Sequence, residues 1–180
     1  EIMYLFCHVL RPKKVLLPVP CFSEYERVAV SVEAEVEYFY LDKEKAFVIC
    51  YEELANALPE NAILFLGNPN NPTGNSLDKE GFANFLSIAK RKNCFVVLDE
   101  SFIDFLQDAE EFTLRNYCYE YGNLFLIHSM TKFFAIPGLR LGFGVFPQML
   151  AEKLRQATDC CNVNNLAQAA GVAALQDFEY

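Results

Sequence analysis

The sequence predicts a three-layer α/β fold, in which a mainly parallel sheet carries helices on both faces. Segments rich in β-branched and aromatic residues alternate along the chain with segments of helical periodicity, an order typical of βαβ units. The segments 62–67 and 94–98 are continuously apolar, as expected for strands buried on both faces of a parallel sheet. The 180 residues, 53% of them hydrophobic, suffice for one globular domain with a sizeable core.

The predicted strands are short apolar segments. The first begins at Val15 and is expected to end at Pro18, because proline removes a backbone donor. The last is expected to run from Arg140 to Phe146. In chain order, the expected strands are 15–17, 36–41, 62–67, 94–98, 124–127 and 140–146.

Helices are predicted between these strands. The chain opens on an apparent helix, because Ile2, Leu5, Phe6 and Val9 share one face, but nothing precedes them that could cap it. The far end is equally abrupt, so we expect a fragment of a longer protein. A further helix is expected after Ser76, taken as its N-cap. The other expected helices are 23–33, 51–58, 147–157 and 165–176.

The composition argues against several classes of partner. A net charge of −9 disfavours nucleic acid, whose phosphates need clustered Lys and Arg. No apolar run could span a bilayer and no leader pattern is present, so a cytoplasmic protein without membrane contact is expected. The seven cysteines form no C-x-x-C pair and the chain has only two histidines, which argues against a metal site. The cysteines, adjacent Cys160 and Cys161 included, are expected to be small buried apolar residues.

Unusual polar residues follow three of the predicted strands. They are Asn68–Gly74, Asp99, and the segment Ser129–Lys132. In open α/β sheets, ligands bind beyond the carboxyl ends of the strands. The sequence therefore predicts a binding site there.

Lys132 and Arg140 are the cationic candidates for this site. A lone lysine is usually a solvated surface residue, but Lys132 has strongly apolar sequence neighbours. Burial would favour the neutral amine, which is the nucleophile that a Schiff base needs. The Arg140 guanidinium can grip a phosphate through two parallel hydrogen bonds, although an ion pair with one of the many acids is an equal alternative.

Asp99 and the loop Asn68–Gly74 leave alternatives open. An acid that ends an apolar strand is costly unless it is paired or functional, but Asp99 could also cap a helix or loop. The residues of Asn68–Gly74 all favour turns, so their composition alone does not separate a turn from a ligand contact.

Taken together, these motifs resemble the fold-type I enzymes that depend on pyridoxal 5′-phosphate (PLP), in the order and spacing of the class I and II aminotransferases. They are Asn68–Gly74 (NPNNPTG), Asp99-Glu100, Ser129–Lys132 (SMTK) and Arg140. The resemblance covers essentially the whole chain. It implies that residues 1–180 form a PLP-binding large domain, without an N-terminal segment and a C-terminal small domain.

The resemblance also implies roles for the residues around the cofactor ring. Lys132 would hold PLP as a Schiff base and later move protons, which makes it catalytic together with Asp99. Asp99 would pair with the pyridine nitrogen, and Asn71 would contact the phenolic oxygen. Phe22 matches the aromatic residue that stacks on the ring. Phe102 stands where many aminotransferases have a tyrosine, so it cannot donate to the phenolic oxygen.

At the other end of the cofactor, the resemblance implies that Ser129, Thr131 and Arg140 bind the phosphate. It also implies a small-molecule amino-acid or amino-acid phosphate substrate and a homodimer. No metal is implied.

Within this family the sequence is most similar to threonine-phosphate decarboxylase of cobalamin biosynthesis, a relative of histidinol-phosphate aminotransferase. The stretches that carry this similarity are Asp99–Phe105, Thr131–Gly142 and Asn162–Ala167. Three functions follow as expectations. The first is decarboxylation of L-threonine O-3-phosphate, the second is transamination of histidinol phosphate or a related amino acid, and the third is a truncated, non-catalytic PLP-binding core.

Overall fold

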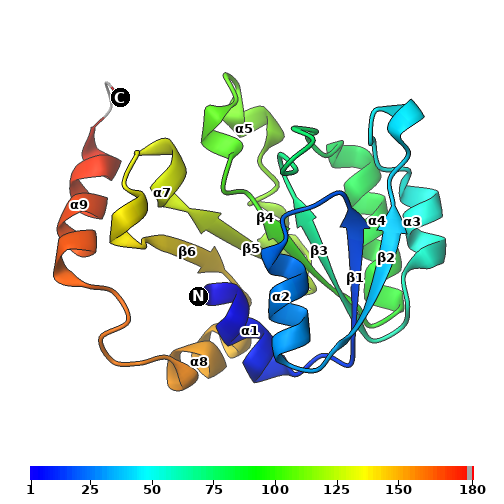
Figure 1. Cartoon of the computed structure of the whole chain (residues 1–180), viewed down its shortest axis with the longest axis horizontal. Coiled ribbons are helices and arrows are strands. Elements are labelled where there is room, and N and C mark those ends of the chain that lie inside the picture. The colour runs from blue at the N-terminus through cyan, green and yellow to red at the C-terminus, as the bar shows by residue number, and fades with distance from the viewer. Residues whose placement is uncertain (178–179) are drawn as a thin grey trace.

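A computed structural model describes residues 1–177 and 180, and within them the chain forms one six-stranded sheet (Figure 1). The strand order is β2-β1-β3-β4-β5-β6, and neighbours are parallel except β5 and β6, which are antiparallel. The strands are β1 (Lys14–Val19), β2 (Glu35–Tyr40), β3 (Ala62–Gly67), β4 (Phe95–Asp99), β5 (Leu124–Ser129) and β6 (Gly142–Val145). The predicted, mainly parallel sheet is confirmed.

Helices cover both faces of the sheet, so the predicted three layers are confirmed (Figure 1). One face carries α1 (Ile2–Leu10), α2 (Glu24–Ser31) and α8 (Gln148–Ala157). The other carries α3 (Tyr51–Ala57), α4 (Lys79–Arg91) and α6 (Tyr117–Glu120). The last helix, α9 (Asn165–Gln176), lies near β6 and places its buried Gly171 against Leu141.

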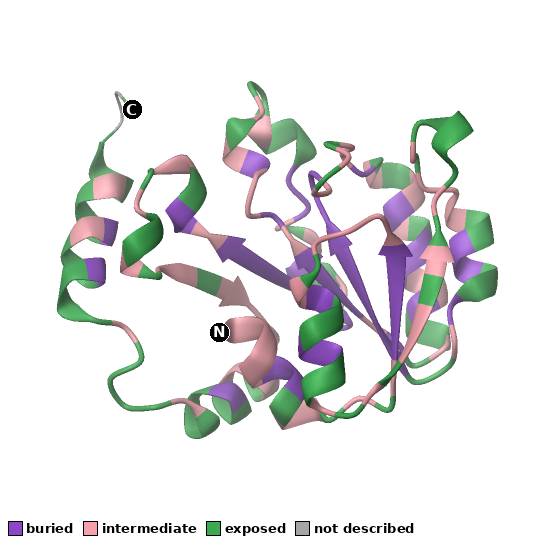
Figure 2. Cartoon of the chain, viewed as in Figure 1, coloured by how far each residue is buried: buried purple, intermediate pink, exposed green. Residues whose placement is uncertain are grey.

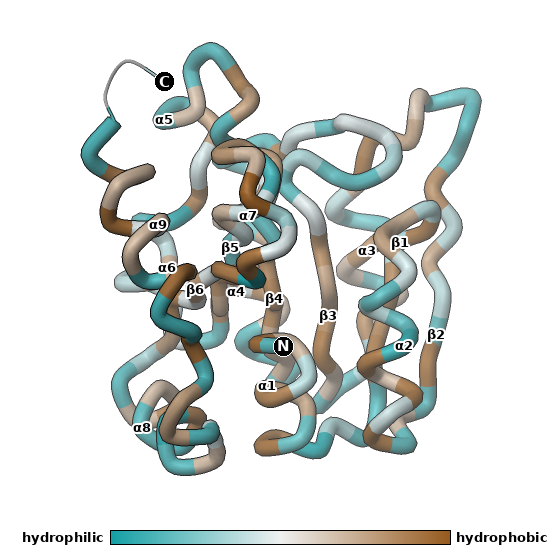
Figure 3. The backbone as a smooth tube through the Cα atoms, turned by 60° about the vertical axis from the view of Figure 1, so that its left-hand side comes forward, coloured by the Kyte–Doolittle hydropathy of each residue, from teal (hydrophilic) through white to brown (hydrophobic). Residues whose placement is uncertain are grey.

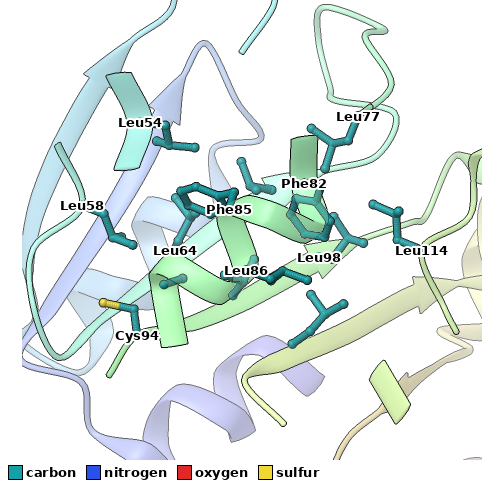
Figure 4. Close-up of a cluster of buried hydrophobic side chains, with 14 of the residues drawn as sticks. Leu54, Leu58, Leu64, Leu77, Phe82, Phe85, Leu86, Cys94, Leu98 and Leu114 are labelled. Carbon is teal, nitrogen blue, oxygen red and sulfur yellow. The ribbon is translucent and has the colours of Figure 1, made fainter. Parts of the chain in front are cut away.

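The core consists of two apolar clusters, one on each side of the sheet. Successive side chains of a strand point to opposite faces, so Leu64 and Leu66 of β3 pack toward α3 and α4, whereas Ile63 and Phe65 pack toward α1 and α2. Figure 4 shows the first cluster, with Phe82 and Phe85 of α4 against the sheet. All six residues of β3 are buried, which explains its continuous apolar sequence (Figure 2).

The polar segments gather at one end of the sheet. Figure 3 shows apolar residues along β3 and β4 and more polar residues in the loop that follows β3. Within the described residues, the structure contains no helix with the length and apolar character needed to cross a membrane.

Every strand except β3 differs from its predicted bounds by one or two residues at an end, and two of these differences have a clear structural cause. β1 continues through Pro18, because its pairing with β3 ends at Leu16 and only β2 accompanies it further. A proline is tolerated where the strand pairs with a neighbour on one side only. β6 begins at Gly142 rather than Arg140, because Arg140 adopts a left-handed conformation (φ 58°) at the end of the turn η3 (Pro137–Leu139).

The start of α4 also differs from the prediction. Asp78, not Ser76, is the N-cap, and its Oδ2 accepts a hydrogen bond of 2.7 Å from the backbone N–H of Gly81. Several one-turn elements were not predicted, because three or four residues are too few to show a period. They are η1 (Lys43–Lys45), η2 (Ile103–Phe105), α5 (Ala109–Phe112) and α7 (Met130–Phe133), together with α6 and η3.

Candidate functional site

A cavity of about 460 Å³ lies at the carboxyl ends of β4 and β5. The first residues of α1, the loop after β3 and the segment 158–163 complete its walls. All eight residues predicted for the site line this one cavity: Phe22, Asn71, Asp99, Phe102, Ser129, Thr131, Lys132 and Arg140. The tertiary structure thus brings together residues from five separate segments, while the role of each toward a cofactor stays a prediction.

Asp99 is half-buried at the end of β4, and each of its carboxylate oxygens has a hydrogen-bond donor. Oδ1 accepts from the backbone N–H of Ser101 at 2.9 Å, and Oδ2 accepts from the Tyr25 hydroxyl at 3.0 Å. The bond from Ser101 is the local loop contact that the sequence left open as an alternative. It is compatible with a ligand contact, because a carboxylate has about four acceptor sites.

Tyr25 is the residue of this site that the sequence reasoning missed. The sequence placed it only within the expected helix 23–33, yet it lines the cavity and donates to Asp99. Burial first, and the neighbouring Asp99 carboxylate second, raise the pKa of Tyr25 well above its usual value. The available signal was the tyrosine itself, because the hydroxyl of a buried tyrosine usually finds a partner.

Ser129 and Thr131 stand at the turn between β5 and α7. Their hydroxyl oxygens lie 2.7 Å apart, and the Ser129 Oγ accepts a longer bond from the backbone N–H of Thr131. Gly142 of β6 pairs with Ser129 across the antiparallel ladder. A Cβ at Gly142 would lie 2.6 Å from the carbonyl oxygen of His128, so only glycine allows this approach.

Lys132 and Arg140 are both exposed. The expected burial of Lys132 is therefore wrong: α7 is a single turn that buries Met130 and Thr131 and leaves Lys132 open at the cavity wall. The Arg140 guanidinium donates to the carbonyl oxygen of Pro137 at 2.8 Å. Over the described part of the chain, no acidic group lies within ion-pair distance of Arg140, so the ion-pair alternative receives no support.

The loop Asn68–Gly74 is held by its own side chains. The buried Asn68 amide donates to the Glu100 Oε1 at 3.1 Å and to the Phe112 carbonyl at 3.0 Å. The Asn70 amide donates to the Pro20 carbonyl at 3.0 Å. These bonds fix the path of the loop at which Asn71 reaches the cavity, so the segment is both a turn and a part of the cavity wall.

The cysteine prediction is correct in part. Cys7, Cys94 and Cys118 are buried, but Cys160 and Cys161 are exposed between α8 and α9. Both thiols are exposed because the segment that joins the two helices lies away from both core clusters. The Sγ atoms of this adjacent pair lie 3.7 Å apart, and with Asp159 they place three possible ligand atoms within 4.8 Å of one another.

Comparison with known proteins agrees with this geometry. The family model "Aminotransferase class I and II" matches residues 2–180. A relative from Caldanaerobacter subterraneus, provisionally named threonine-phosphate decarboxylase, is 35% identical over 180 residues, which cover 100% of this chain and 49% of the relative. The chain thus spans about half the length of this curated relative.

Two solved structures extend the likeness to three dimensions. The histidinol-phosphate aminotransferase from Clostridium acetobutylicum superposes with a TM-score of 0.89 at 32% identity, over 100% of this chain and 54% of that one. The L-threonine-O-3-phosphate decarboxylase from Porphyromonas gingivalis has a TM-score of 0.82 at 26% identity, over 96% of this chain and 50% of that one.

The sheet, the cavity with its residues and the match over nearly the full chain lead to the same assignment. The enzymes of this family depend on PLP. We conclude that the chain belongs to the aminotransferase class I and II family.

Proposed function

We propose that this chain is the PLP-binding large domain of an enzyme that decarboxylates L-threonine O-3-phosphate. The observation that carries the proposal is the cavity lined by the amine of Lys132, the carboxylate of Asp99 and a group of side chains that could donate to a phosphate. A relative provisionally named for this substrate, 35% identical over the whole chain, supports the choice of reaction.

The side chains of the cavity fit PLP in their chemistry. When bound, PLP supplies an aldehyde that condenses with amines and a protonated pyridine ring that accepts electrons from the substrate α-carbon. Lys132 would offer the amine, and its Nζ would also serve as the base that moves a proton. The Asp99 carboxylate would keep a proton on the ring nitrogen, and its own charge is stabilised by the donors Tyr25 and Ser101.

The phosphate would lie at the turn after β5. The hydroxyls of Ser129 and Thr131 and the guanidinium of Arg140 are the donors there, and Arg140 is well suited to a dianion because it forms paired bonds. Residues of the first turn of α1 also line the cavity, and the free N–H groups at the start of a helix favour an anion.

The remaining predicted residues would orient the ring. Phe22 supplies an aromatic face, and Asn71 is the side chain that would contact the phenolic oxygen. Phe102 lines the same cavity without a hydroxyl. A neutral hydrogen bond of this kind contributes about 1 kcal/mol, so its absence should adjust the cofactor's properties rather than prevent binding.

Transamination of histidinol phosphate or a related amino acid is the second candidate function. The observation that favours it is the superposition on the Clostridium acetobutylicum enzyme over the whole chain. The two reactions differ in which bond of the substrate α-carbon is held perpendicular to the ring, so the groups that orient the substrate decide between them. Cofactor-binding residues are common to both reactions.

Product analysis tests the choice. The whole protein is incubated with PLP and L-threonine O-3-phosphate, and released carbon dioxide is measured. We expect carbon dioxide and an amine, and no dependence on 2-oxoglutarate. Release of none, together with a 2-oxoglutarate-dependent product from histidinol phosphate, would replace the first reaction by the second. A protein that binds PLP and turns over neither substrate would leave the third expectation, a non-catalytic core.

We further propose that the whole protein is a cytoplasmic homodimer that serves cobalamin biosynthesis. The homodimer and the pathway rest on the family resemblance, whereas the cytoplasmic location rests on the sequence pattern of the chain. Light scattering of the purified whole protein measures its mass in solution. A mass of one chain in the presence of PLP would contradict the dimer.

A further inference from the structure

We infer that Tyr25 is a positioning residue, which holds the Asp99 carboxylate and the Phe22 ring in the places that the cofactor needs. The inference rests on the proposed function and extends it to a residue outside the predicted set. The Tyr25 hydroxyl donates to Asp99, its ring packs against Phe22, and all three residues line the cavity.

Tyr25 itself is rigidly placed. Its side chain is 2% exposed, and its ring stacks on Phe65 of β3 with centroids 5.3 Å apart and planes at 14°. Phe22 stands edge-on to the same ring at 5.6 Å and 89°. Because Phe65 is a fully buried strand residue, the tyrosine ring forms a fixed platform between the sheet and Phe22.

The hydroxyl of Tyr25 is a permanent donor. Burial and the nearby carboxylate raise its pKa, so it keeps its proton over the working range of an enzyme. It donates to Oδ2 of Asp99, while the N–H of Ser101 holds Oδ1. With one donor on each oxygen, the carboxylate cannot rotate freely, and its charged form is stabilised.

The sequence explains why one residue can serve both neighbours. Phe22 lies three residues before Tyr25, at the entrance of α2, whereas Asp99 lies 74 residues after it. A phenylalanine at position 25 would retain the stacking on Phe65 and Phe22 but would lose the donor to Asp99. The ring and the hydroxyl can therefore be tested separately.

The experiment compares Tyr25→Phe with Tyr51→Phe, using the whole protein. Tyr51 is a matched control because its hydroxyl donates to the Asp78 carbonyl at 3.3 Å and it does not line the cavity. We expect Tyr25→Phe to raise the PLP dissociation constant about tenfold, the loss typical of a hydrogen bond to a charged group. The pH profile of the bound cofactor's absorbance should also shift, whereas Tyr51→Phe should leave both unchanged.

A double variant distinguishes an effect of the Tyr25–Asp99 hydrogen bond from a general loss of packing around the cavity. If Tyr25 acts through Asp99, then Tyr25→Phe should have no further effect on PLP affinity in an Asp99→Asn background. Equal losses in both backgrounds would overturn the inference, as would equal behaviour of the two tyrosine variants. Failure of the wild-type protein to bind PLP is a different outcome, which would overturn the proposed function itself.

A second measurement needs no loss of the hydroxyl and so avoids a variant that fails to fold. Tyr25→3-fluorotyrosine keeps the ring and gives one assigned fluorine resonance. We expect this resonance to shift when PLP is added, and the same label at Tyr51 to stay unchanged. A Tyr25 resonance that does not respond to bound PLP would overturn the positioning role.

Discussion

The amide of Asn68 donates a buried hydrogen bond of 3.1 Å to Glu100, and this bond joins the loop after β3 to the end of β4. The Glu100 carboxylate also accepts from the Thr113 hydroxyl at 2.7 Å and from the N–H of Leu114 at 2.8 Å. Three donors therefore satisfy a fully buried acid that has no cationic partner among the described residues. Since Glu100 directly follows Asp99, the network supports both the loop after β3 and the end of β4, which line the cavity.

Glu100→Ala should lower the free energy of unfolding by about 3 kcal/mol, because each of its buried donors loses its acceptor. Glu100→Gln should cost less, since its amide oxygen still accepts. Urea unfolding followed by circular dichroism measures the difference. The control is Glu110→Ala, an exposed acid of α5 that should change stability by less than about 0.5 kcal/mol. Equal losses for Glu100→Ala and the control would refute a supporting network.

Gly142→Ala should destabilise the β5–β6 ladder. The added Cβ would lie 2.6 Å from the His128 carbonyl oxygen, so the two strands must move apart at Ser129. We expect a loss of about 1–3 kcal/mol in the free energy of unfolding. Gly138→Ala is the matched control, because a Cβ there meets no atom within 4 Å. If thermal melting gave the same midpoint for both variants, the close approach would be wrong.

Alkaline pH should weaken the fold through its buried thiols. Burial raises the pKa of both Cys7 and Cys118 to about 12, from a usual value of 9.0. Between these values the unfolded chain releases protons that the folded chain retains, so stability is full below about pH 9 and falls as pH rises. Urea midpoints measured from pH 8 to 11 should therefore decrease. The urea midpoint of Cys7→Ala should decrease less steeply with pH. If it decreased as steeply as that of the wild type, the buried Cys7 thiol would not be a cause of the weakening.

Lys132→Ala should abolish turnover while leaving the fold intact. The lysine is exposed at the cavity wall, so its loss should change the free energy of unfolding by less than about 0.5 kcal/mol. Borohydride reduction of the whole protein with PLP, followed by peptide mapping, should label Lys132 in the wild type and no lysine in the variant. Lys153→Ala, at an exposed site of α8, is the control. Label at another lysine would refute the assignment.

Some features of the fold were readable from the sequence because they depend on local patterns. The continuous apolar run 62–67 identified β3, and the helix expected after Ser76 corresponds to α4. The exact first and last residues of the helices and strands were predicted less accurately. Asp78 and Ser76 are both good N-caps by residue type, and only the bond from Gly81 distinguishes them.

The candidate site was readable for a related reason. In a parallel sheet the carboxyl ends of the strands share one edge, so polar residues that follow different strands must meet there. Asn71, Asp99 and Lys132 could therefore be grouped before their positions were known, and they line one cavity. The family motifs then supplied their expected roles.

The sequence by itself determined the layers, the strand edge that carries the cavity and eight of the residues that line it. Only the tertiary structure decided the bond between Tyr25 and Asp99, the antiparallel approach of β6 and the exposure of Lys132. The physical reason is the sequence separation over which each interaction acts. Hydrophobic period and turn chemistry act over a few neighbouring residues, whereas Tyr25 and Asp99 are 74 residues apart and meet only when α2 packs on the finished sheet.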